Sequence, residues 1–348
     1  MGRRRARGRR VSWLAVLGWS GIGMLLAGAF FAALGALNQN LYGASSFVER
    51  YLEAIADDEI TTAATTPGVA LSEAELDAMG LPADVSTAML RSNVVGSGPQ
   101  DITIIDDEAR DDGTHVVTAS YRLESRIVET TFEVQPIAPL YGVLNRWEFA
   151  RSPLAVIDVT AAHNPFFMVG SLTLDTRARK SGDELAAFTQ TAPYLAIAPA
   201  VYEFDYDSTL LTAQPEEVTV EPSERTSVTV SSQATPAFTE RVQAQVDQFL
   251  EACATQPVLQ PTDCPFGMVI DDRVVGDPAW SISASPIVSL TPGDDAFEMP
   301  PTAGVAHLSV DLQSLFDGDY YTLEEDETFT LALDARIRTD GSISVQLK

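Results

Sequence analysis

The sequence is poor in the side chains from which most catalytic centres and metal sites are built. Its 348 residues include two cysteines, three histidines and only two lysines, Lys180 and Lys348. Two cysteines exclude a disulfide-dense scaffold and a zinc site of four thiolates. The motifs G-x-S-x-G, H-E-x-x-H and G-x-x-x-x-G-K-[ST] are absent. Their absence removes the usual signals of serine hydrolases, zinc proteases and P-loop proteins.

The three histidines stand alone in the sequence. His115, His163 and His307 have no second histidine and no carboxylate at the spacing of metal ligands. The residues expected to face inward from the first run of strands are apolar, so we expect no buried acid–base pair. The sequence therefore predicts a protein that is not an enzyme and that holds no metal and no cofactor.

Positive charge is scarce and concentrated at the beginning of the sequence. The 22 lysines and arginines face 49 acidic residues, and the net charge of −27 argues against a nucleic-acid partner. No acidic residue precedes Glu49, whereas six arginines precede residue 11. These are Arg3, Arg4, Arg5, Arg7, Arg9 and Arg10.

An uncharged, apolar stretch follows these arginines. As a helix, residues 11–37 would be longer than the hydrocarbon core of a bilayer, which is about 30 Å thick. Because positive residues stay on the cytoplasmic side, we expect a cytoplasmic tail over 1–10 and a transmembrane helix over 11–37. A linker over 38–44 then leads to an extracytoplasmic bulk. A cleaved signal peptide is the alternative, although its apolar core is normally shorter.

The region 45–160 begins with helical periodicity. Ser46 and Glu49 have the spacing of a capping box at the start of an amphipathic stretch. Shorter helices are expected near 71–79 and 83–91, where helical spacing recurs between glycine and proline residues.

From residue 101 onward, apolar residues alternate with polar ones, which predicts antiparallel strands. Asp112-Gly113 supplies the turn between the first two strands, and Arg126–Val134 is the next strand. Trp147–Val159 is the last strand, interrupted by Pro153. Helices followed by such strands predict one curved sheet covered by helices on one side.

The segment Phe47–Asp58 (FVERYLEAIADD), followed by strands that end at Trp147, resembles the NTF2-like cone fold. Such domains often stand outside a membrane anchor in envelope proteins of high-GC Gram-positive bacteria. The resemblance implies a pocket between helix and sheet. In some members of the fold this pocket is an active site, whereas in many members it only binds a ligand. The residues that could line it are Tyr121, Phe132 and Trp147, which at best predict a hydrophobic binding pocket.

The rest of the chain is expected to form two more domains. Short strands separated by prolines predict a small β-sandwich over 161–234, and a helix followed by strands predicts an α+β domain over 235–348. Trp147 and Trp280 are each followed by four residues and Ser-Pro, an echo that favours two related domains. The predicted fold class is therefore α+β: a transmembrane helix, then two NTF2-like domains flanking a small β-sandwich.

Cys253 and Cys264 can form only one disulfide. An oxidising exterior permits the bond, and the proline-containing loop between them can bring the two cysteines together. No C-x-x-C spacing and no neighbouring histidine points to redox use. The sequence therefore predicts a structural disulfide.

These features predict a single-pass, membrane-anchored protein of the cell envelope. Its partners are expected to be the lipid bilayer and another envelope protein, a cell-wall component or a small ligand. One alternative is an enzyme that uses a cryptic NTF2-like pocket. Another is a structural element that dimerises through its transmembrane helix, where Gly28, Ala32 and Ala36 form a stripe of small residues.

Overall fold

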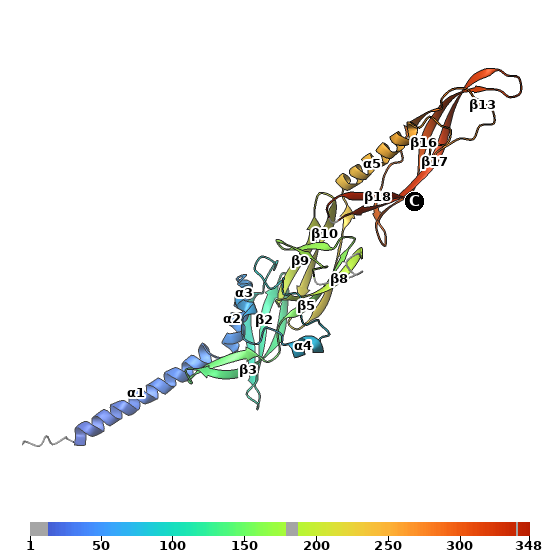
Figure 1. The fold of residues 1–348 in the computed structure, drawn as a ribbon. Coiled ribbons are helices and arrows are strands. Elements are labelled where there is room, and N and C mark those ends of the chain that lie inside the picture. Colours follow the sequence, from blue (N-terminus) through green and yellow to red (C-terminus); the bar gives the residue numbers. More distant parts are fainter. Residues whose placement is uncertain (1–12, 179–186, 339) are drawn as a thin grey trace, which may run out of the picture. The chain divides into compact units, whose positions relative to one another are not determined.

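The computed structural model describes residues 13–178, 187–338 and 340–348 of a mixed α+β protein with several antiparallel sheets (Figure 1). The N-terminal arginines, the start of the predicted span and Lys180 lie outside these residues. The chain divides into two compact units. The first comprises Met1–Val156, Leu195–Val201 and Thr219–Arg225, and the second comprises Ile157–Tyr194, Tyr202–Val218 and Thr226–Lys348. The division into domains at residues 160 and 234 stays a prediction.

Helices come first in the first unit. They are α1 (Trp13–Asn40), α2 (Ala44–Ala56), α3 (Ile60–Ala64) and α4 (Glu73–Ala78). The apolar residues of α2 recur at intervals of three and four, so they form one face, and this face is buried.

The capping box predicted at Ser46 is wrong. Because α2 begins at Ala44, Ser46 lies inside the helix, where its hydroxyl donates to the carbonyl of Asn40 (2.7 Å). A capping box is present instead before α4, between Ser72 and Glu75. The predicted helix near 83–91 is also wrong, because this segment forms turns.

Four strands of the first unit form one antiparallel sheet in sequence order. They are β1 (Gln100–Ala109), β2 (His115–Leu123), β3 (Arg126–Leu140) and β4 (Leu144–Phe149). The predicted turn at Asp112-Gly113 is confirmed, with Gly113 at a φ of 86°. The predicted strand Trp147–Val159 is wrong, since Ser152 and its neighbours separate β4 from β5 (Ala155–Ala162), which belongs to another sheet. The Ser152 hydroxyl donates to the carbonyl of Val69 (2.5 Å), so the chain turns there.

Aromatic rings pack between α2 and part of this sheet. The ring centroids of Phe47 and Tyr51 lie 5.0 and 4.9 Å from that of Phe149, and Tyr51 lies 6.3 Å from Phe132. The Tyr51 hydroxyl donates to the carbonyl of Ala198 (2.7 Å). Close-packed rings with a satisfied hydroxyl make this region a core.

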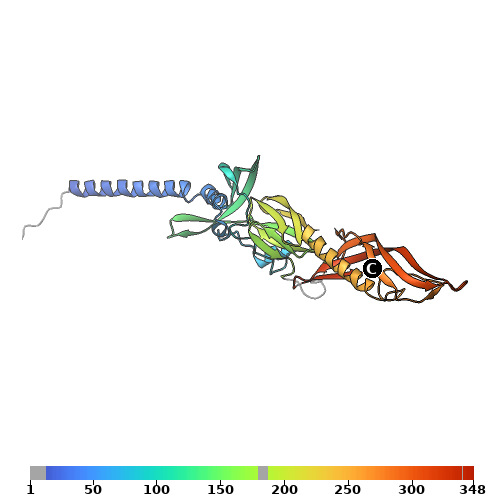
Figure 2. The same ribbon diagram turned by 90° about the horizontal axis from the view of Figure 1, so that it is seen from above.

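α1 is a single helix ahead of α2 (Figures 1 and 2) and exposes large apolar side chains. The side chains of Trp19, Met24 and Phe31 are 75%, 78% and 69% exposed. Within the described residues, no single helix meets the length and apolarity needed to cross a membrane. The pair Met24–Asn40 and Ala44–Ala56, bent by 44°, meets them together, as signal sequences also do.

Two sheets follow, with strands mainly in the second unit. β12 (Gln233–Ala234), β10 (Leu211–Val220), β9 (Ala200–Asp207), β6 (Phe166–Val169) and β7 (Leu172–Asp175) form one, in that order. β11 (Arg225–Ser231), β5 and β8 (Thr189–Ala196) form the other. The ring of Phe167 on β6 lies 5.3 Å from that of Tyr194 on β8, which joins the two sheets through aromatic packing.

The C-terminal part of the second unit packs one helix on a third sheet. α5 (Pro236–Ala254) begins at the cap Thr235 and buries Phe238, Val242, Val246 and Leu250, as its spacing predicts. Its sheet contains β13 (Arg273–Val274), β14 (Ala279–Ala284), β15 (Thr291–Pro292), β16 (Phe297–Gln313), β17 (Tyr320–Ile337) and β18 (Ile343–Leu347). α5 runs beside the long β16–β17 hairpin in both views (Figures 1 and 2).

Candidate functional site

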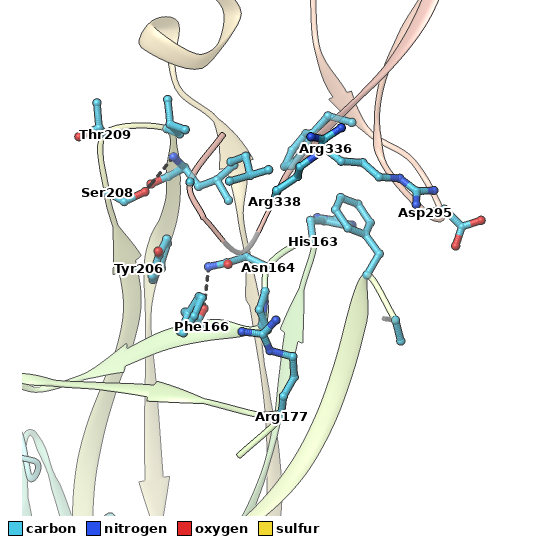
Figure 3. A pocket seen from close by; sticks show the side chains of 18 residues that line it. His163, Asn164, Phe166, Arg177, Tyr206, Ser208, Thr209, Asp295, Arg336 and Arg338 are labelled. Carbon is cyan, nitrogen blue, oxygen red and sulfur yellow. Dashed lines mark hydrogen bonds between the residues drawn. The ribbon is translucent and has the colours of Figure 1, made fainter. Parts of the chain in front are cut away.

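The second unit contains a cavity of about 450 Å³, which we call the arginine cavity (Figure 3). It lies among residues from β6, the end of β9, and the β17–β18 connection. Its polar and aromatic lining includes His163, Phe166, Arg177, Phe188, Tyr206, Ser208, Asp295, Arg336 and Arg338. The volume is within the range of small-molecule sites, about 300–1,000 Å³.

Three arginines around one cavity are unusual in this chain. Six of its 22 lysines and arginines precede residue 11, which leaves sixteen for the other 338 positions. Arg177, Arg336 and Arg338 are three of those sixteen. Cationic groups gathered in a strongly acidic protein mark a place where negative charge is attracted.

Arg177 is held in place by its neighbours. Its guanidinium donates to both carboxylate oxygens of Asp175, at 2.8 and 3.0 Å, and lies 5.1 Å from the centre of the Phe166 ring. Burial raises the pKa of Asp175, but the hydrogen bonds from Arg177 outweigh it and hold that pKa below its usual value. Arg177 is therefore largely neutralised and shapes the wall of the cavity.

Arg336 and Arg338 carry the charge that is left. They lie two residues apart at the end of β17, and Figure 3 shows both beside His163. One guanidinium nitrogen of Arg338 donates to the Ser344 hydroxyl (3.0 Å), and after the hydrogen bonds from Ser342 its charge helps to lower the pKa of Asp340. Among the described residues, neither arginine has a carboxylate within salt-bridge distance, although Asp295 also lines the cavity. Both arginines line the cavity, so an anion bound there would be stabilised by their positive charge.

The hydroxyl of Ser208 and the imidazole of His163, both in the cavity lining, form hydrogen bonds with the backbone. Ser208 donates to the carbonyl of Leu211 (2.9 Å) and accepts from its N–H (3.0 Å), closing a turn. His163 Nδ1 donates to the carbonyl of Ser232 (3.2 Å). A nucleophile needs a base within hydrogen-bond reach, and Ser208 and His163 are each bonded to backbone groups rather than to one another.

A serine, an aspartate and a histidine also meet in the first unit. The Asp107 carboxylate accepts from the Ser45 hydroxyl (2.5 Å) and contacts His115 Nδ1 (2.5 Å). Burial raises the pKa of Asp107, but these hydrogen bonds outweigh it and lower that pKa. In a catalytic triad the histidine lies between the other two, whereas here the aspartate does, so His115 cannot relay the serine proton.

His307 contacts two carboxylates, which its position in the sequence did not reveal. Its Nδ1 and Nε2 lie 2.7 Å from Asp326 and 2.7 Å from Glu324. The register of β16 and β17 places Asp326 directly opposite His307 and Glu324 two residues away, opposite Ser309. Hydrogen bonds to both carboxylates raise the pKa of His307. The carboxylates occupy different ring nitrogens, and no described group of three or more His, Cys, Asp or Glu could hold a metal ion.

We expect this cluster to make stability depend on pH. The pKa of His307 is raised above its unfolded value of 6.5, so its protonated form stabilises the folded state. This stabilisation is fully present below pH 6.5 and is lost as pH rises through the raised pKa. The free energy of unfolding, measured with urea, should therefore fall more between pH 6 and about pH 9 in the native protein than in His307→Gln. Equal slopes in the two proteins would contradict this assignment.

The predicted pocket residues of the first unit are all buried. Tyr121 donates to or accepts from the Thr130 hydroxyl (2.6 Å), and its burial raises its pKa to about 12. Phe132 belongs to the aromatic core described above. Trp147 borders a second cavity, of about 360 Å³, whose lining does not include Tyr121 or Phe132.

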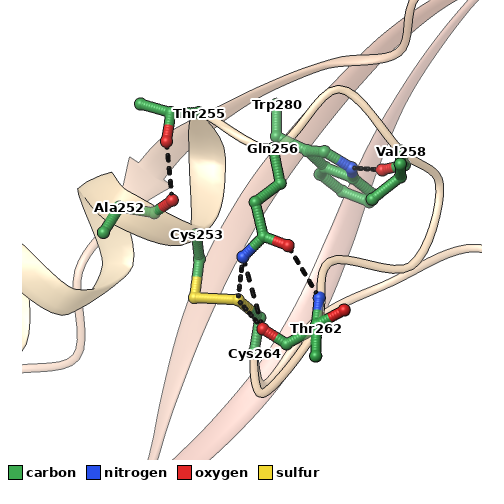
Figure 4. The surroundings of a disulfide bond; sticks show 8 residues. All are labelled: Ala252, Cys253, Thr255, Gln256, Val258, Thr262, Cys264 and Trp280. Carbon is green, nitrogen blue, oxygen red and sulfur yellow. Dashed lines mark hydrogen bonds between the residues drawn. A yellow bond between two sulfur atoms is a disulfide. The ribbon is translucent and has the colours of Figure 1, made fainter.

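The predicted disulfide between Cys253 and Cys264 is confirmed (Figure 4). It ties the last turn of α5 to the loop that follows, with the two Cα atoms 5.8 Å apart. Gln256 closes the same loop, since its side chain accepts from the Thr262 N–H (2.9 Å). Trp280 Nε1 donates to the carbonyl of Val258 (2.9 Å), which fixes the loop on β14.

Removing the disulfide should loosen the end of α5. With a sequence separation of 11 between its cysteines, Cys253→Ser with Cys264→Ser is expected to lower the free energy of unfolding by about 2–3 kcal/mol. Urea unfolding measures this change. Adding reductant should lower the free energy of unfolding of the native protein by the same amount and leave that of the double variant unchanged. A variant as stable as the native protein would show that the loop is held by its hydrogen bonds alone.

No known family model matches this chain, and no curated protein is significantly similar to it in sequence.

Proposed function

We propose that this is a single-pass membrane protein of the cell envelope whose outer part binds an anionic ligand in the arginine cavity. The single observation that carries the binding role is that Arg336 and Arg338 line one cavity, beside the neutralised Arg177, in a chain of net charge −27. The aromatic walls Phe166, Phe188 and Tyr206 suit a ligand with an apolar body beside its phosphate or carboxylate.

The exposed apolar surface of α1 supports the anchoring role. Large hydrophobic side chains on a free helix are unfavourable in water and favourable in lipid. α2 is an unsuitable part of a span because its apolar face is buried in the first unit and it carries Glu49, Arg50 and Glu53. The span is therefore assigned to the uncharged stretch 11–37, with the preceding arginines in the cytoplasm.

The disulfide supports an extracytoplasmic location for the bulk of the chain, because reducing compartments keep thiols free. On this reading residues 45–160 form an NTF2-like domain, supported by α2 packed on the sheet β1–β4. Residues 161–234 form a small sandwich, supported by the packing of Phe167 against Tyr194. Residues 235–348 form the second α+β domain.

Two measurements on the full chain test the proposal. Membranes washed with alkaline carbonate should retain the protein in the pellet, because this wash removes peripheral proteins and leaves inserted helices in the bilayer. Calorimetric titration of the detergent-solubilised protein with phenyl phosphate should give saturable binding that weakens as salt rises. Release into the carbonate wash would overturn the anchor, and the absence of saturable heat would overturn the binding role.

A further inference from the structure

The tip of the β3–β4 hairpin is fastened to the end of α1. The Asn38 side chain donates to the carbonyl of Val143 (2.9 Å) and accepts from the N–H of Asn145 (3.1 Å). Trp147 Nε1 donates to the carbonyl of Tyr42 (2.8 Å), two residues after α1 ends. These three bonds hold the hairpin at the place where the proposed membrane span leaves the bilayer.

This tip is apolar, exposed and free of acidic residues. Leu140, Tyr141 and Val143 are 39%, 87% and 48% exposed. No Asp or Glu occurs between Glu133 and Glu148, in a chain with 49 acidic residues.

Tyr141 itself has an unusual backbone. Its φ of 55° is left-handed, a conformation that is uncommon for a bulky residue, and Gly142 follows at 75°. Tyrosine is enriched at membrane–water interfaces, where its ring lies among the headgroups. An interfacial role therefore gives a reason for a large aromatic side chain at this exposed turn.

The second cavity lies beside the hairpin and carries positive charge. Arg50 and Arg146 line it together with Tyr42, Leu140 and Trp147. Arg50 donates to the carbonyl of Leu41 (2.8 Å), so its guanidinium is held next to the end of α1. Neither arginine is ion-paired with a described residue.

We infer that this part of the first unit is a lipid-contact site. The hairpin tip enters the headgroup layer, and Arg50 and Arg146 bind the phosphate of an anionic phospholipid. This inference rests on the proposed function, because it needs α1 in the bilayer. It adds that the folded unit itself touches the membrane and selects among its lipids.

A single fluorophore tests the contact. Both native cysteines are in the disulfide, so Tyr141→Cys offers one reactive thiol for an environment-sensitive label. With the full chain reconstituted in phosphatidylcholine–phosphatidylglycerol vesicles, nitroxide lipids labelled near the headgroup should quench this label. A label at Ser125→Cys, in the β2–β3 turn at the other end of the sheet, should remain unquenched.

The two failures can be told apart by flotation. A protein that does not float with the vesicles overturns the proposed anchor, and this inference with it. A protein that floats while its Tyr141→Cys label stays unquenched overturns this inference alone.

Headgroup selection is tested with the arginines. We compare quenching of the Tyr141→Cys label by spin-labelled phosphatidylglycerol with quenching by spin-labelled phosphatidylcholine at equal bulk concentration. The ratio of the two local lipid concentrations at the label should be at least about five. Arg50→Gln with Arg146→Gln should reduce this ratio to about one. The control Arg122→Gln, whose arginine is paired with Asp101 (2.8 Å), should leave it unchanged. A native ratio of one, or an unaffected ratio in the double variant, would overturn the phosphate site.

Discussion

Replacing Arg336 and Arg338 together by glutamine is expected to weaken the binding of phenyl phosphate at least about tenfold. A hydrogen bond to a charged group contributes about 1.5–3 kcal/mol, and both guanidinium groups lie at the arginine cavity with no salt bridge to a described residue. Glutamine keeps a hydrogen-bonding group at each position but removes the charge. Calorimetric titration at low salt measures the change in Kd.

The matched control for this experiment is Arg241→Gln. Arg241 is an exposed arginine of α5 and does not line the cavity. Its substitution removes one positive charge, as each substitution in the cavity does, and should leave the Kd within about twofold of the native value. Comparison with inorganic phosphate tests the aromatic walls, since phenyl phosphate should bind more tightly. An unchanged Kd in the double variant would place the anion elsewhere and contradict the assignment of this cavity.

Gly68→Ala is expected to destabilise the first unit by roughly 3–5 kcal/mol. Gly68 has a φ of +79°, and a Cβ atom there would overlap the backbone of Phe149. The same turn provides the carbonyl of Pro67, which accepts from the Phe149 N–H (3.0 Å). The added methyl group would therefore separate this turn from β4. Hydrogen exchange of β4 peptides, together with urea unfolding, measures the loss.

Gly80→Ala separates the two causes of that loss. Gly80 is also left-handed, at a φ of +66°, but no atom lies within 4 Å of a Cβ built on it. Its substitution should cost only about 1 kcal/mol, which is the backbone term. Similar losses in the two variants would show that the contact with Phe149 is not what requires a glycine at residue 68.

Local features of the fold were predictable from the sequence because they depend on neighbouring residues. The turn at Asp112-Gly113, the buried face of α5 and the disulfide follow from spacing and turn chemistry. The errors occurred where tertiary contacts outweigh local preference. In the segment expected as a helix near 83–91, the carbonyl of Ser86 accepts from the Leu195 N–H (2.9 Å), a partner more than a hundred residues away.

The candidate site was not predictable for the same reason. Arg177 and Arg336 are 159 positions apart, and only the fold brings them to one cavity. His307 meets Glu324 and Asp326 through the register of the β16–β17 hairpin, which a search for ligand spacing does not reveal. The composition gave one indication, however. Lysine and arginine are scarce after residue 10, so each of them is a candidate for binding negative charge.

Protease digestion from outside intact, wall-stripped cells tests the central claim most directly. If residues 11–37 span the membrane with the arginines inside, protease should remove the bulk of the chain. An N-terminal fragment that ends soon after residue 40 should remain in the membrane and be detected by an antibody against the first ten residues. Full-length protein that resists digestion until the cells are lysed would contradict both the anchor and the extracytoplasmic location.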